Sequence, residues 1–376
     1  MDRSSTLKSL DLFICCGELS GDQIGADIVK NLQGLKTAGV IGPELRSLNV
    51  TEVAPMESLQ MMGFFPVLFS IFTLLKLQRH LISFILKENP KAVVLIDFSG
   101  FNTLLAKKLK KTGYKGKIIK VVCPQIWAWR KHRKKEIEKY YDALFTLFPF
   151  EKELFKDSPL HTVYIGHPSA KKIAHLPPSK TLTHLEEKKI ISLFPGSRKK
   201  DILINLPPQL RSAAHVPQAH ICVSVSFESY VPLVHSLAKK AGVEITIILP
   251  KDRFELMRLT KVAIAKFGTI SLELALCKTP TIMMIQLDWI SAKILKYIFR
   301  LSLPFYALPN ILLKKPLFQE IILNISGESS LSSAVVDLAL STKKQNLQKT
   351  LSESVIKIFE GLDPGEKAAE EILTLI

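Results

Sequence analysis

Asp97 follows a run of five apolar residues, 92–96, and its carboxylate could take part in proton transfer. If the run is a buried parallel strand, its carboxyl end lies at the mouth of a ligand-binding crevice. A carboxylate at that place could take a proton from an attacking hydroxyl group. The alternative is that Asp97 caps the helix that follows, through backbone N–H groups.

Residues 193–201 (LFPGSRKKD) combine the end of another apolar run with a glycine turn and a helix start. Gly196 and Ser197 offer N–H and hydroxyl donors, and Arg198 offers a planar guanidinium that fits a diphosphate. Asp201 would cap the helix. An ordinary turn with a solvated arginine is the competing interpretation.

Residues 266–276 (KFGTISLELAL) place Gly268 and Thr269 at a further helix start, with Glu273 one turn later. Backbone N–H and hydroxyl groups can hold a phosphate there, and the glutamate can accept two ribose hydroxyls. The simpler alternative is a first-turn glutamate that complements the helix dipole. Asn310 follows a proline in a loop near two lysines and is another polar candidate.

Residues 123–133 (CPQIWAWRKHR) form an aromatic and basic loop. Trp127 and Trp129 could pack against a sugar or an acyl chain, and Arg130 could pair with a phosphate. A packing anchor for the loop is the competing interpretation of at least one tryptophan. The lysine-rich stretch before this loop, residues 107–120, is interpreted as the solvated face of a helix.

Apolar runs alternate with helical patterns along most of the chain, which predicts parallel βαβ units. The glycine turn at residues 17–22 (GELSGD) follows the first run and lets a ligand approach backbone N–H groups. The predicted class is α/β, with two Rossmann-like doubly wound parallel-sheet domains facing a cleft. We expect strands at 10–16, 92–97, 117–122, 143–147, 162–165, 189–194, 220–225, 244–249, 261–265 and 281–285, and helices at 23–32, 67–86, 101–111, 133–139, 150–156 and 271–277.

The domain boundary is expected in the proline-rich, polar interval 175–188, which has the composition of a linker. This predicts an N-terminal domain of residues 1–174 and a second domain of residues 175–344. Residues 345–376 have the pattern of one or two amphipathic helices. We expect this helical tail to pack back on the N-terminal domain or on a partner.

A net charge of +17 over 376 residues indicates an anionic partner. Nucleic acid, an anionic membrane surface and a phosphorylated substrate all qualify. Nucleic acid is the weakest of these, because the chain has neither zinc-finger spacing nor an aromatic RNA-binding signature. The five cysteines include no C-x-x-C pair, which favours buried, reduced thiols in a cytosolic protein, and the histidine spacing predicts no metal site.

The most lipid-like segment is residues 64–75 (FFPVLFSIFTLL), and Lys76 and Arg79 follow it. It is shorter than the ~20 residues that span a bilayer. A segment lying on a membrane surface and a buried core helix are equally good interpretations. A second apolar and basic patch covers residues 289–306. The first residues of the chain lack the apolar core of a signal peptide.

The motifs GELSGD, LIDFSGFN, CPQIWAWR, LFPFEK, IGHP, LFPGSR, FGTISLE and LPN follow one another from about residue 12 to about residue 320. In this order and spacing the chain resembles the lipid-A-disaccharide synthases. The resemblance implies an inverting glycosyltransferase of the B-type fold that needs no cofactor. It would join UDP-2,3-diacylglucosamine to 2,3-diacylglucosamine 1-phosphate and release the β-1,6-linked disaccharide phosphate precursor of lipid A, and UDP. Members are peripheral on the cytoplasmic face of the inner membrane, and some are homodimers that exchange C-terminal segments.

The resemblance also assigns roles to residues. Asp97 would be the general base for the acceptor 6-hydroxyl, and Glu18 would bind or orient the acceptor; in an alternative assignment Glu18 is the base. The remaining candidates follow by motif: Ser197 and Arg198 for the UDP diphosphate, Gly268, Thr269 and Glu273 for phosphate and ribose, Asn310 near the nucleotide or sugar, and Gln125 and Arg130 for the acceptor phosphate.

The chain departs from the family pattern at four positions: the family usually has proline where Ser99 stands, often serine where Phe267 stands, and commonly glutamate where Pro66 and Asp201 stand. The region 224–261 also looks shortened. Two other functions stay open at this point. One is a different UDP-sugar enzyme of the same fold, such as a 2-epimerase, and the other is a non-catalytic protein that binds a membrane surface.

Overall fold

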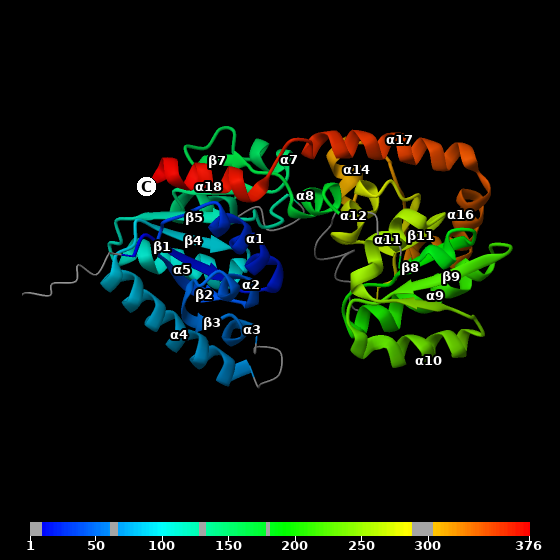
Figure 1. Cartoon of the computed structure of the whole chain (residues 1–376), viewed down its shortest axis with the longest axis horizontal. Coiled ribbons are helices and arrows are strands. Elements are labelled where there is room, and N and C mark those ends of the chain that lie inside the picture. Colours follow the sequence, from blue (N-terminus) through cyan, green and yellow to red (C-terminus); the bar gives the residue numbers. More distant parts are fainter. Residues whose placement is uncertain (1–9, 61–66, 128–132, 178–180, 288–303) are drawn as a thin grey trace, which may run out of the picture. The chain divides into compact units, whose positions relative to one another are not determined.

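The protein is described here by a computed structural model, which covers residues 10–60, 67–127, 133–177, 181–287 and 304–376, with side chains omitted at 60 and 67–71. The chain forms two compact α/β units (Figure 1). Unit 1 comprises Met1–Pro168 and Gly361–Ile376, and unit 2 comprises Ser169–Glu360.

Unit 1 is built on a seven-stranded sheet in which all strands are parallel, in the order β3-β2-β1-β4-β5-β6-β7. The central strands are continuous apolar runs because both of their faces are covered by helices. The strands are β1 (Leu12–Cys16), β2 (Thr37–Ile41), β3 (Thr51–Pro55), β4 (Ala92–Ile96), β5 (Lys117–Val121), β6 (Ala143–Thr146) and β7 (His161–Tyr164).

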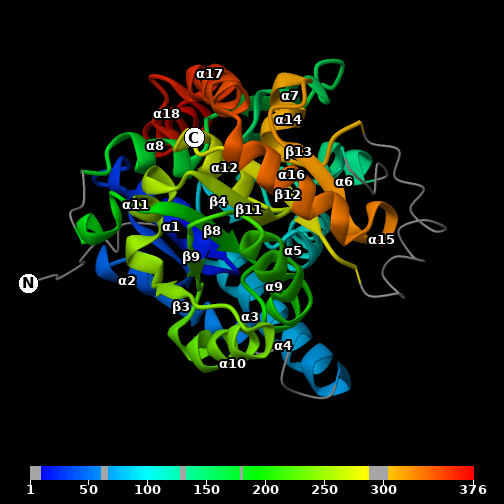
Figure 2. The same ribbon diagram turned by 90° about the vertical axis from the view of Figure 1, so that its right-hand side faces the viewer.

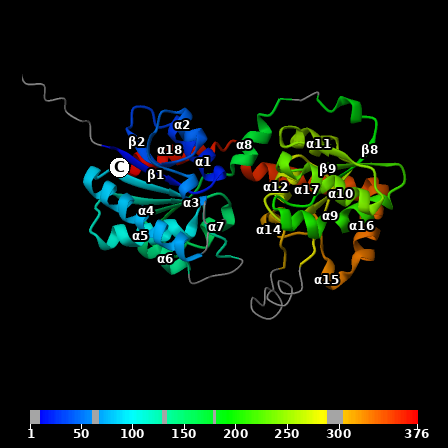
Figure 3. The same cartoon turned by 90° about the horizontal axis from the view of Figure 1, so that it is seen from below.

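Helices cover both faces of this sheet (Figure 3). One face buries its side chains against α4, α5 and α6, in a core that includes Phe13, Val93, Leu105 and Ile137. The other face is covered by α1, α2 and the last helix of the chain, α18. The helices of unit 1 are α1 (Leu19–Lys30), α2 (Pro43–Ser47), α3 (Glu57–Gln60), α4 (Val67–Glu88), α5 (Ser99–Lys111), α6 (Arg133–Tyr140), α7 (Pro149–Glu153) and α18 (Pro364–Leu375).

Unit 2 repeats the design with a six-stranded parallel sheet in the order β10-β9-β8-β11-β12-β13. Figure 2 shows α9 and α10 on one side of these strands and α12 and α17 on the other. The strands are β8 (Lys189–Phe194), β9 (Ala219–Ser224), β10 (Thr246–Ile248), β11 (Val262–Lys266), β12 (Thr281–Ile285) and β13 (Gln319–Ile322).

The helices of unit 2 include three long ones whose apolar faces form its main core with the sheet, α9, α10 and α16. In chain order the helices are α8 (Pro168–Ala174), α9 (Lys199–Ala214), α10 (Val231–Ala241), α11 (Arg253–Leu259), α12 (Ile270–Leu276), α14 (Leu308–Leu313), α15 (Leu323–Ser326), α16 (Glu328–Leu340) and α17 (Thr342–Phe359), with short 3-10 helices at Thr183–Leu185, Glu228–Tyr230 and Pro250–Asp252.

Each sheet is doubly wound and has one topological switch point, where the strand order reverses. In unit 1 the switch point lies between β1 and β4, and in unit 2 it lies between β8 and β11. The predicted class, two Rossmann-like parallel-sheet domains with a helical tail, is confirmed. Ligands of such sheets bind beyond the carboxyl ends of the strands at the switch point, so these two places define where to look for a site.

The chain is divided between the units differently from the predicted domains, 1–174, 175–344 and 345–376. The interval 175–188 packs within unit 2, where Leu185 is buried and the Leu182 N–H donates to Glu255 at 3.0 Å. Helix α17 also belongs to unit 2, because it packs on α12, α14 and α16.

Helix α18 alone of the tail helices returns to unit 1, where it lies beside α1 (Figure 1). The approach is close, since a Cβ on Gly365 would stand 2.5 Å from the backbone oxygen of Asp27. The predicted tail region, for which one or two helices were expected, thus contains parts of two helices, and only the second packs on unit 1.

Helix α4 has one buried and one exposed face. Leu81 and Ile85 are fully buried in the core of unit 1, whereas Phe72 is 72% exposed and Leu75 is 38% exposed. The buried residues belong to the part of α4 that follows the apolar segment 64–75; of the segment's own described side chains, Phe72 and Leu75 are exposed and Leu74 is half-buried. In the described ranges, no helix has the length and apolar character needed to cross a membrane.

Candidate functional site

Glu18 and Asp97 flank the switch point of unit 1, as expected. Strands β1 and β4 pair in register up to Cys16 and Ile96, so the two turns that follow begin at the same level of the sheet. Glu18 is exposed and stands at the N-terminus of α1 in an extended conformation. Asp97 is half-buried at the end of β4. Two carboxylates from residues 79 positions apart are thus brought to one edge of the sheet by strand pairing.

Gly17 allows the two turns to touch. A Cβ on Gly17 would lie 2.3 Å from Cγ of Phe98, so only a glycine lets the Phe98 ring lie against the β1–α1 turn. Asp97 and Phe98 both have a left-handed backbone, with φ of +48° and +36°. Such residues cost about 1–3 kcal/mol each and are typical of functional turns.

Asn102 holds this strained turn in place. It is fully buried in α5, and its amide donates to the backbone oxygens of Ile96 and Asp97, both at 3.1 Å. The N-cap residue of α5 is Phe98, and the alternative role of Asp97 as a helix cap is not observed. Within the part of the chain that the structure describes, the Asp97 carboxylate has no hydrogen-bond partner.

Lys120 is a buried cation beside this turn that the sequence analysis missed. The stretch 107–120 was interpreted as a solvated helix face, but Lys120 lies in β5 and is fully buried. Its ammonium donates to the Ser99 hydroxyl at 3.3 Å. Burial lowers the pKa of Lys120 to about 8, while Asp97 acts in the opposite direction. A lysine between Ile119 and Val121, within a predicted strand, is the sequence feature that could have revealed it.

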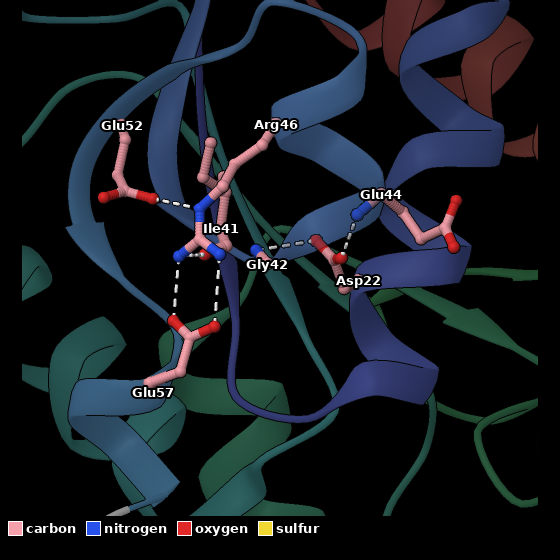
Figure 4. A network of polar contacts seen from close by, with 7 residues as sticks. All are labelled: Asp22, Ile41, Gly42, Glu44, Arg46, Glu52 and Glu57. Carbon is pink, nitrogen blue, oxygen red and sulfur yellow. Dashed lines mark hydrogen bonds and ion pairs between the residues drawn. The ribbon is translucent and has the colours of Figure 1, made fainter.

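Asp22, the last residue of GELSGD, has a structural role (Figure 4). Its buried carboxylate accepts from the N–H groups of Gly42 at 2.8 Å and Glu44 at 2.7 Å, and so fixes the start of α2. Nearby, the Arg46 guanidinium bridges Glu52 and Glu57. Of the two carboxylates in this motif, Glu18 is therefore the one available to a ligand.

The loops after β5, β6 and β7 bring together an aromatic cluster of Trp127, Phe148, Phe150 and His167. Phe150 packs edge-on against Trp127 and stacks on Phe148, each with ring centroids 5.5 Å apart, and His167 lies 5.3 Å from Phe148. Trp127 thus serves as a packing anchor. Gln125 is exposed in the same loop. Trp129 and Arg130 lie outside the described residues.

Glu151 and His167 keep this cluster uncharged at neutral pH. Glu151 is buried beside it and accepts from the N–H groups of Leu147 and Phe148, both at 3.2 Å. Burial raises the pKa of Glu151 to about 8, although these two hydrogen bonds oppose the shift. Burial lowers the pKa of His167 to about 4. The edge of the sheet beyond β6 is therefore apolar as well as aromatic.

Ser197 and Arg198 lie at the switch point of unit 2, between β8 and the start of α9. Both are exposed, and Arg198 is the N-cap residue of α9 with no side-chain cap. An uncapped helix N-terminus with an exposed arginine at the N-cap position is a favourable place for a phosphate group. Arg198 makes no hydrogen bond or ion pair to other described residues.

Gly196 makes the turn before α9 possible. Its φ is +119°, and a Cβ there would stand 2.7 Å from Cβ of Asp201. Asp201 lies in the first turn of α9 and pairs with Lys266 at the end of β11, with 3.1 Å between charged atoms. This ion pair ties the β8 turn to the β11 turn, which contains the exposed residues Gly268 and Thr269.

Glu273 is buried in α12 and already has protein partners. Its Oε1 accepts from Arg253 at 2.8 Å and from the Ser169 hydroxyl at 3.3 Å. Burial raises the pKa of Glu273, and Arg253 opposes that shift. Arg253 was not among the sequence candidates, since nothing in its local sequence distinguishes it from a surface arginine.

Asn310 is fully buried and uses its side-chain amide inside unit 2. It donates to the Phe318 oxygen and to Glu320, both at 2.8 Å, and accepts from the Phe318 N–H at 2.9 Å. Asn310 therefore shapes the loop around α14. Phe267, the departure from the family pattern beside Gly268, packs on Tyr306 with ring centroids 6.0 Å apart.

The cysteines are free thiols, and four of them, Cys15, Cys16, Cys123 and Cys222, are buried. Cys277 is half-buried. Burial raises the thiol pKa of all five, so they are poor nucleophiles at neutral pH. Across the described residues, no group of three or more His, Cys, Asp or Glu side chains is arranged to hold a metal ion.

Solved structures with the same architecture define the class of fold. The chain is similar to a putative UDP-N-acetylglucosamine 2-epimerase from Listeria monocytogenes (TM-score 0.62, 11% identity, 97% of this chain and 95% of that one). It is also similar to MurG of Acinetobacter baumannii (TM-score 0.55, 13% identity, 96% and 99%) and to the kitacinnamycin glycotransferase (TM-score 0.59, 12% identity, 98% and 100%). The fold is thus that of the B-type glycosyltransferases.

Sequence comparison is more specific. The family model for lipid-A-disaccharide synthetase matches residues 12–374, and the chain belongs to this family. The lipid-A-disaccharide synthase of Chlamydia abortus is 39% identical over 372 residues, which cover 95% of this chain and 59% of that protein. The corresponding protein of Francisella philomiragia is 31% identical over 330 residues, which cover 82% of this chain and 84% of that one. The chain spans about three fifths of the length of the chlamydial relatives that it matches.

Replacing Glu151 with Gln tests the buried carboxyl. The folded protein holds this proton up to about pH 8, whereas an unfolded glutamate loses it near 4.5, so stability is lost as the pH rises between these values, by about 1.4 kcal/mol per unit. Glutamine keeps the acceptor oxygen but does not ionise. Glu151→Gln should melt a few degrees above wild type at pH 8.5 and close to it at pH 5, measured by circular dichroism. An equal difference at both pH values would contradict this.

Proposed function

We propose that the chain is an inverting glycosyltransferase that joins UDP-2,3-diacylglucosamine to 2,3-diacylglucosamine 1-phosphate, giving the β-1,6-linked disaccharide phosphate and UDP. The observation that supports it best is the chemistry at the two switch points. One has open carboxylates for proton transfer, and the other has a free arginine at an uncapped helix N-terminus. In a chain of this family, these are the groups that the two substrates require.

Unit 1 would take the acceptor. Asp97 would accept the proton of the 6-hydroxyl as that oxygen attacks the anomeric carbon of the donor, and Glu18 would orient the acceptor sugar. In the alternative assignment Glu18, in the turn after β1, is the base. Gln125 and Arg130, after β5, would bind the acceptor phosphate. The left-handed backbone of Asp97 supports its role as base, because residues in strained conformations cluster at functional sites.

Unit 2 would take the nucleotide sugar. Ser197, Arg198 and the first N–H groups of α9 would hold the diphosphate and stabilise the charge that develops on UDP as it leaves. Gly268 and Thr269 would contact phosphate. Glu273 has an oxygen left for ribose hydroxyls while Arg253 and Ser169 hold the other. Asn310 would act by fixing the nearby loop.

The stereochemistry follows from a single displacement. The acceptor oxygen attacks the face of the anomeric carbon opposite to UDP, the C–O bond to UDP breaks, and the proton passes to the base. This step needs one base, which accepts the hydroxyl proton, and one positively charged group, which stabilises the charge that develops on UDP. The aromatic cluster beside the acceptor edge would pack against the apolar surface of an acylated sugar.

A transfer assay with both acylated substrates tests the proposal, with UDP release and the disaccharide product as readouts. UDP release that depends on the acceptor supports it. A 2-epimerase would instead change UDP-N-acetylglucosamine without any acceptor. A folded protein that binds UDP but turns over neither substrate would be the non-catalytic alternative, and the proposal would then be abandoned.

Asp97→Asn should keep UDP affinity unchanged and lower the transfer rate by at least ~100-fold, the usual scale for a general base. Asparagine preserves the size of the side chain but does not accept the proton. UDP binding is measured by calorimetry and transfer by product formation. Glu18→Gln is the matched variant: if it loses the same factor while Asp97→Asn stays active, Glu18 is the base instead.

Arg198→Ala should weaken UDP binding about tenfold or more, because it removes a charge-assisted contact to the diphosphate. Lys240→Ala is the control, since Lys240 is an exposed cation at the end of α10. Calorimetric titration with UDP compares the two. Unchanged affinity in Arg198→Ala would remove the diphosphate from this position.

The exposed face of α4 would place the protein on an anionic membrane surface, the cytoplasmic face of the inner membrane. Phe72 and Leu75 are exposed there, and Lys76 and Arg79 are exposed on the same helix. Such basic residues contribute about 1 kcal/mol each near an anionic leaflet. Phe64 and Phe65 of the same apolar segment, and most of the patch at 289–306, lie outside the described residues. A homodimer that exchanges α18 would keep its packing on α1 and stays a prediction.

Phe72→Glu should weaken binding to phosphatidylglycerol-containing vesicles about tenfold or more, since it replaces an inserting ring with a charge and leaves the buried face of α4 intact. Leu340→Glu, a change at a 62% exposed leucine of unit 2, is the control. Vesicle co-sedimentation gives the affinities, and equal losses in both variants would count against α4.

A further inference from the structure

We infer that Arg253 is a positioning residue for nucleotide binding: it holds one carboxylate oxygen of Glu273, and so leaves the other oxygen for the two ribose hydroxyls. Arg253 would thereby make the site select a ribonucleotide. The inference rests on the proposed function only in that Glu273 binds ribose. Its test measures binding, so its outcome can be separated from that of the transfer assay.

The two carboxylate oxygens of Glu273 have different surroundings. Oε1 accepts from the Arg253 guanidinium at 2.8 Å and from the Ser169 hydroxyl at 3.3 Å. Oε2 makes no hydrogen bond to any other described residue, and 11% of the side chain is exposed. Because a carboxylate oxygen has two lone pairs, Oε2 alone can accept from two adjacent hydroxyls.

Glu273 lies one helical turn behind the phosphate candidates of unit 2. Its N–H donates to the Thr269 oxygen at 3.3 Å, and Thr269 is exposed in the turn after β11. Since β11 pairs with β8, this turn is at the same edge of the sheet as the turn that contains Arg198. A ribose next to the diphosphate of one nucleotide would therefore come within reach of Glu273.

The place of Arg253 is explained by its contact with Glu273 better than by packing. Its guanidinium carbon lies 4.6 Å from the centroid of the Phe254 ring, which fixes the plane of the group while Nη2 reaches Glu273. Its Nε is buried and donates to no described residue. A buried donor without an acceptor destabilises a fold, so an apolar side chain would serve packing alone better.

Two cations act on the Glu273 carboxylate, Arg253 of α11 and Lys172 of α8. Burial raises the pKa of Glu273, and both cations and the Ser169 hydroxyl oppose that shift. Lys172 lies against the Phe254 ring, with its ammonium 5.7 Å from the centroid, whereas Arg253 touches the carboxylate itself. An ionised carboxylate is purely an acceptor, which is the form that two hydroxyl donors require.

The test is calorimetric titration of wild type and Arg253→Met with UDP and with 2′,3′-dideoxy-UDP, which lacks both ribose hydroxyls. Wild type should prefer UDP at least about tenfold, because hydrogen bonds to a charged acceptor are lost with the hydroxyls. Arg253→Met keeps an unbranched side chain and removes the charge and the donors. It should lower the preference to about threefold or less, and leave the affinity for the dideoxy compound within about twofold of wild type.

An equal loss of affinity for both ligands in Arg253→Met would overturn the inference, because Arg253 would then contact another part of the nucleotide or support the fold of the site. An unchanged preference would overturn it as well.

Arg258→Met is the matched control. Arg258 is on the same helix, and its guanidinium donates to the Ile173 oxygen of α8 at 3.2 Å. The variant removes a contact between α11 and α8 without removing a donor to Glu273, and should keep the wild-type affinities for both ligands. If Arg258→Met loses the preference too, the effect belongs to helix packing and the inference is wrong.

The wild-type protein separates this inference from the proposed function. If wild type binds UDP and the dideoxy compound equally well, Glu273 does not bind ribose and the inference fails, while the transfer assay still decides the reaction. If wild type transfers no sugar but Arg253→Met loses the preference for UDP, the proposed function fails and the inference stands.

Ser169→Ala covers the case in which Arg253→Met does not fold. It removes the second donor to Oε1 and should lower the preference for UDP by a smaller factor, with the affinity for the dideoxy compound unchanged. A preference equal to that of wild type would count against the inference.

Discussion

The strands of each sheet run in one direction, and the rest of the molecule depends on this constraint. Parallel pairing collects every strand-end turn at one edge, so groups far apart in the sequence become neighbours. Glu18 and Asp97 lie at one edge because β1 pairs with β4, and Arg198 and Gly268 share an edge because β8 pairs with β11. The glycines at 17 and 196 then allow the turns to approach more closely than any other residue would permit.

Burial of ionisable groups is the second theme of the structure. Burial removes three side chains from water, those of Lys120, Glu151 and His167. It shifts the pKa of each in the direction that favours the uncharged form. Glu151 and His167 are thereby neutral at pH 7 and complete an aromatic surface. Lys120 is different, since a pKa of about 8 leaves it largely protonated at pH 7. The carboxyl edge of the unit 1 sheet thus combines an apolar, aromatic surface with a buried ammonium that donates to Ser99.

The sequence predicted the edge strands β7 and β10 and the central strands except β2, and it missed the edge strands β3 and β13. β8 and β12 were predicted with their observed ends, because covered faces demand uninterrupted hydrophobic residues. β2, β3 and β13 were not predicted. β2 contains a glycine, and β3 and β13 are edge strands with exposed polar residues, so neither periodicity nor composition distinguishes them from loops. Pairing with a neighbour makes them strands.

The sequence by itself determined the class of fold, the family and the types of residue at the strand ends, because these follow from local patterns and motif order. Only the tertiary structure decided which of those residues are free to act. The side chains of Asp22 and Asn310 make internal hydrogen bonds, whereas those of Asp97 and Arg198 make none to other described residues. It also decided that Lys120 is buried, with its ammonium donating to Ser99. The physical reason is that burial and pairing depend on which segments lie side by side, and that is settled between residues far apart in the chain.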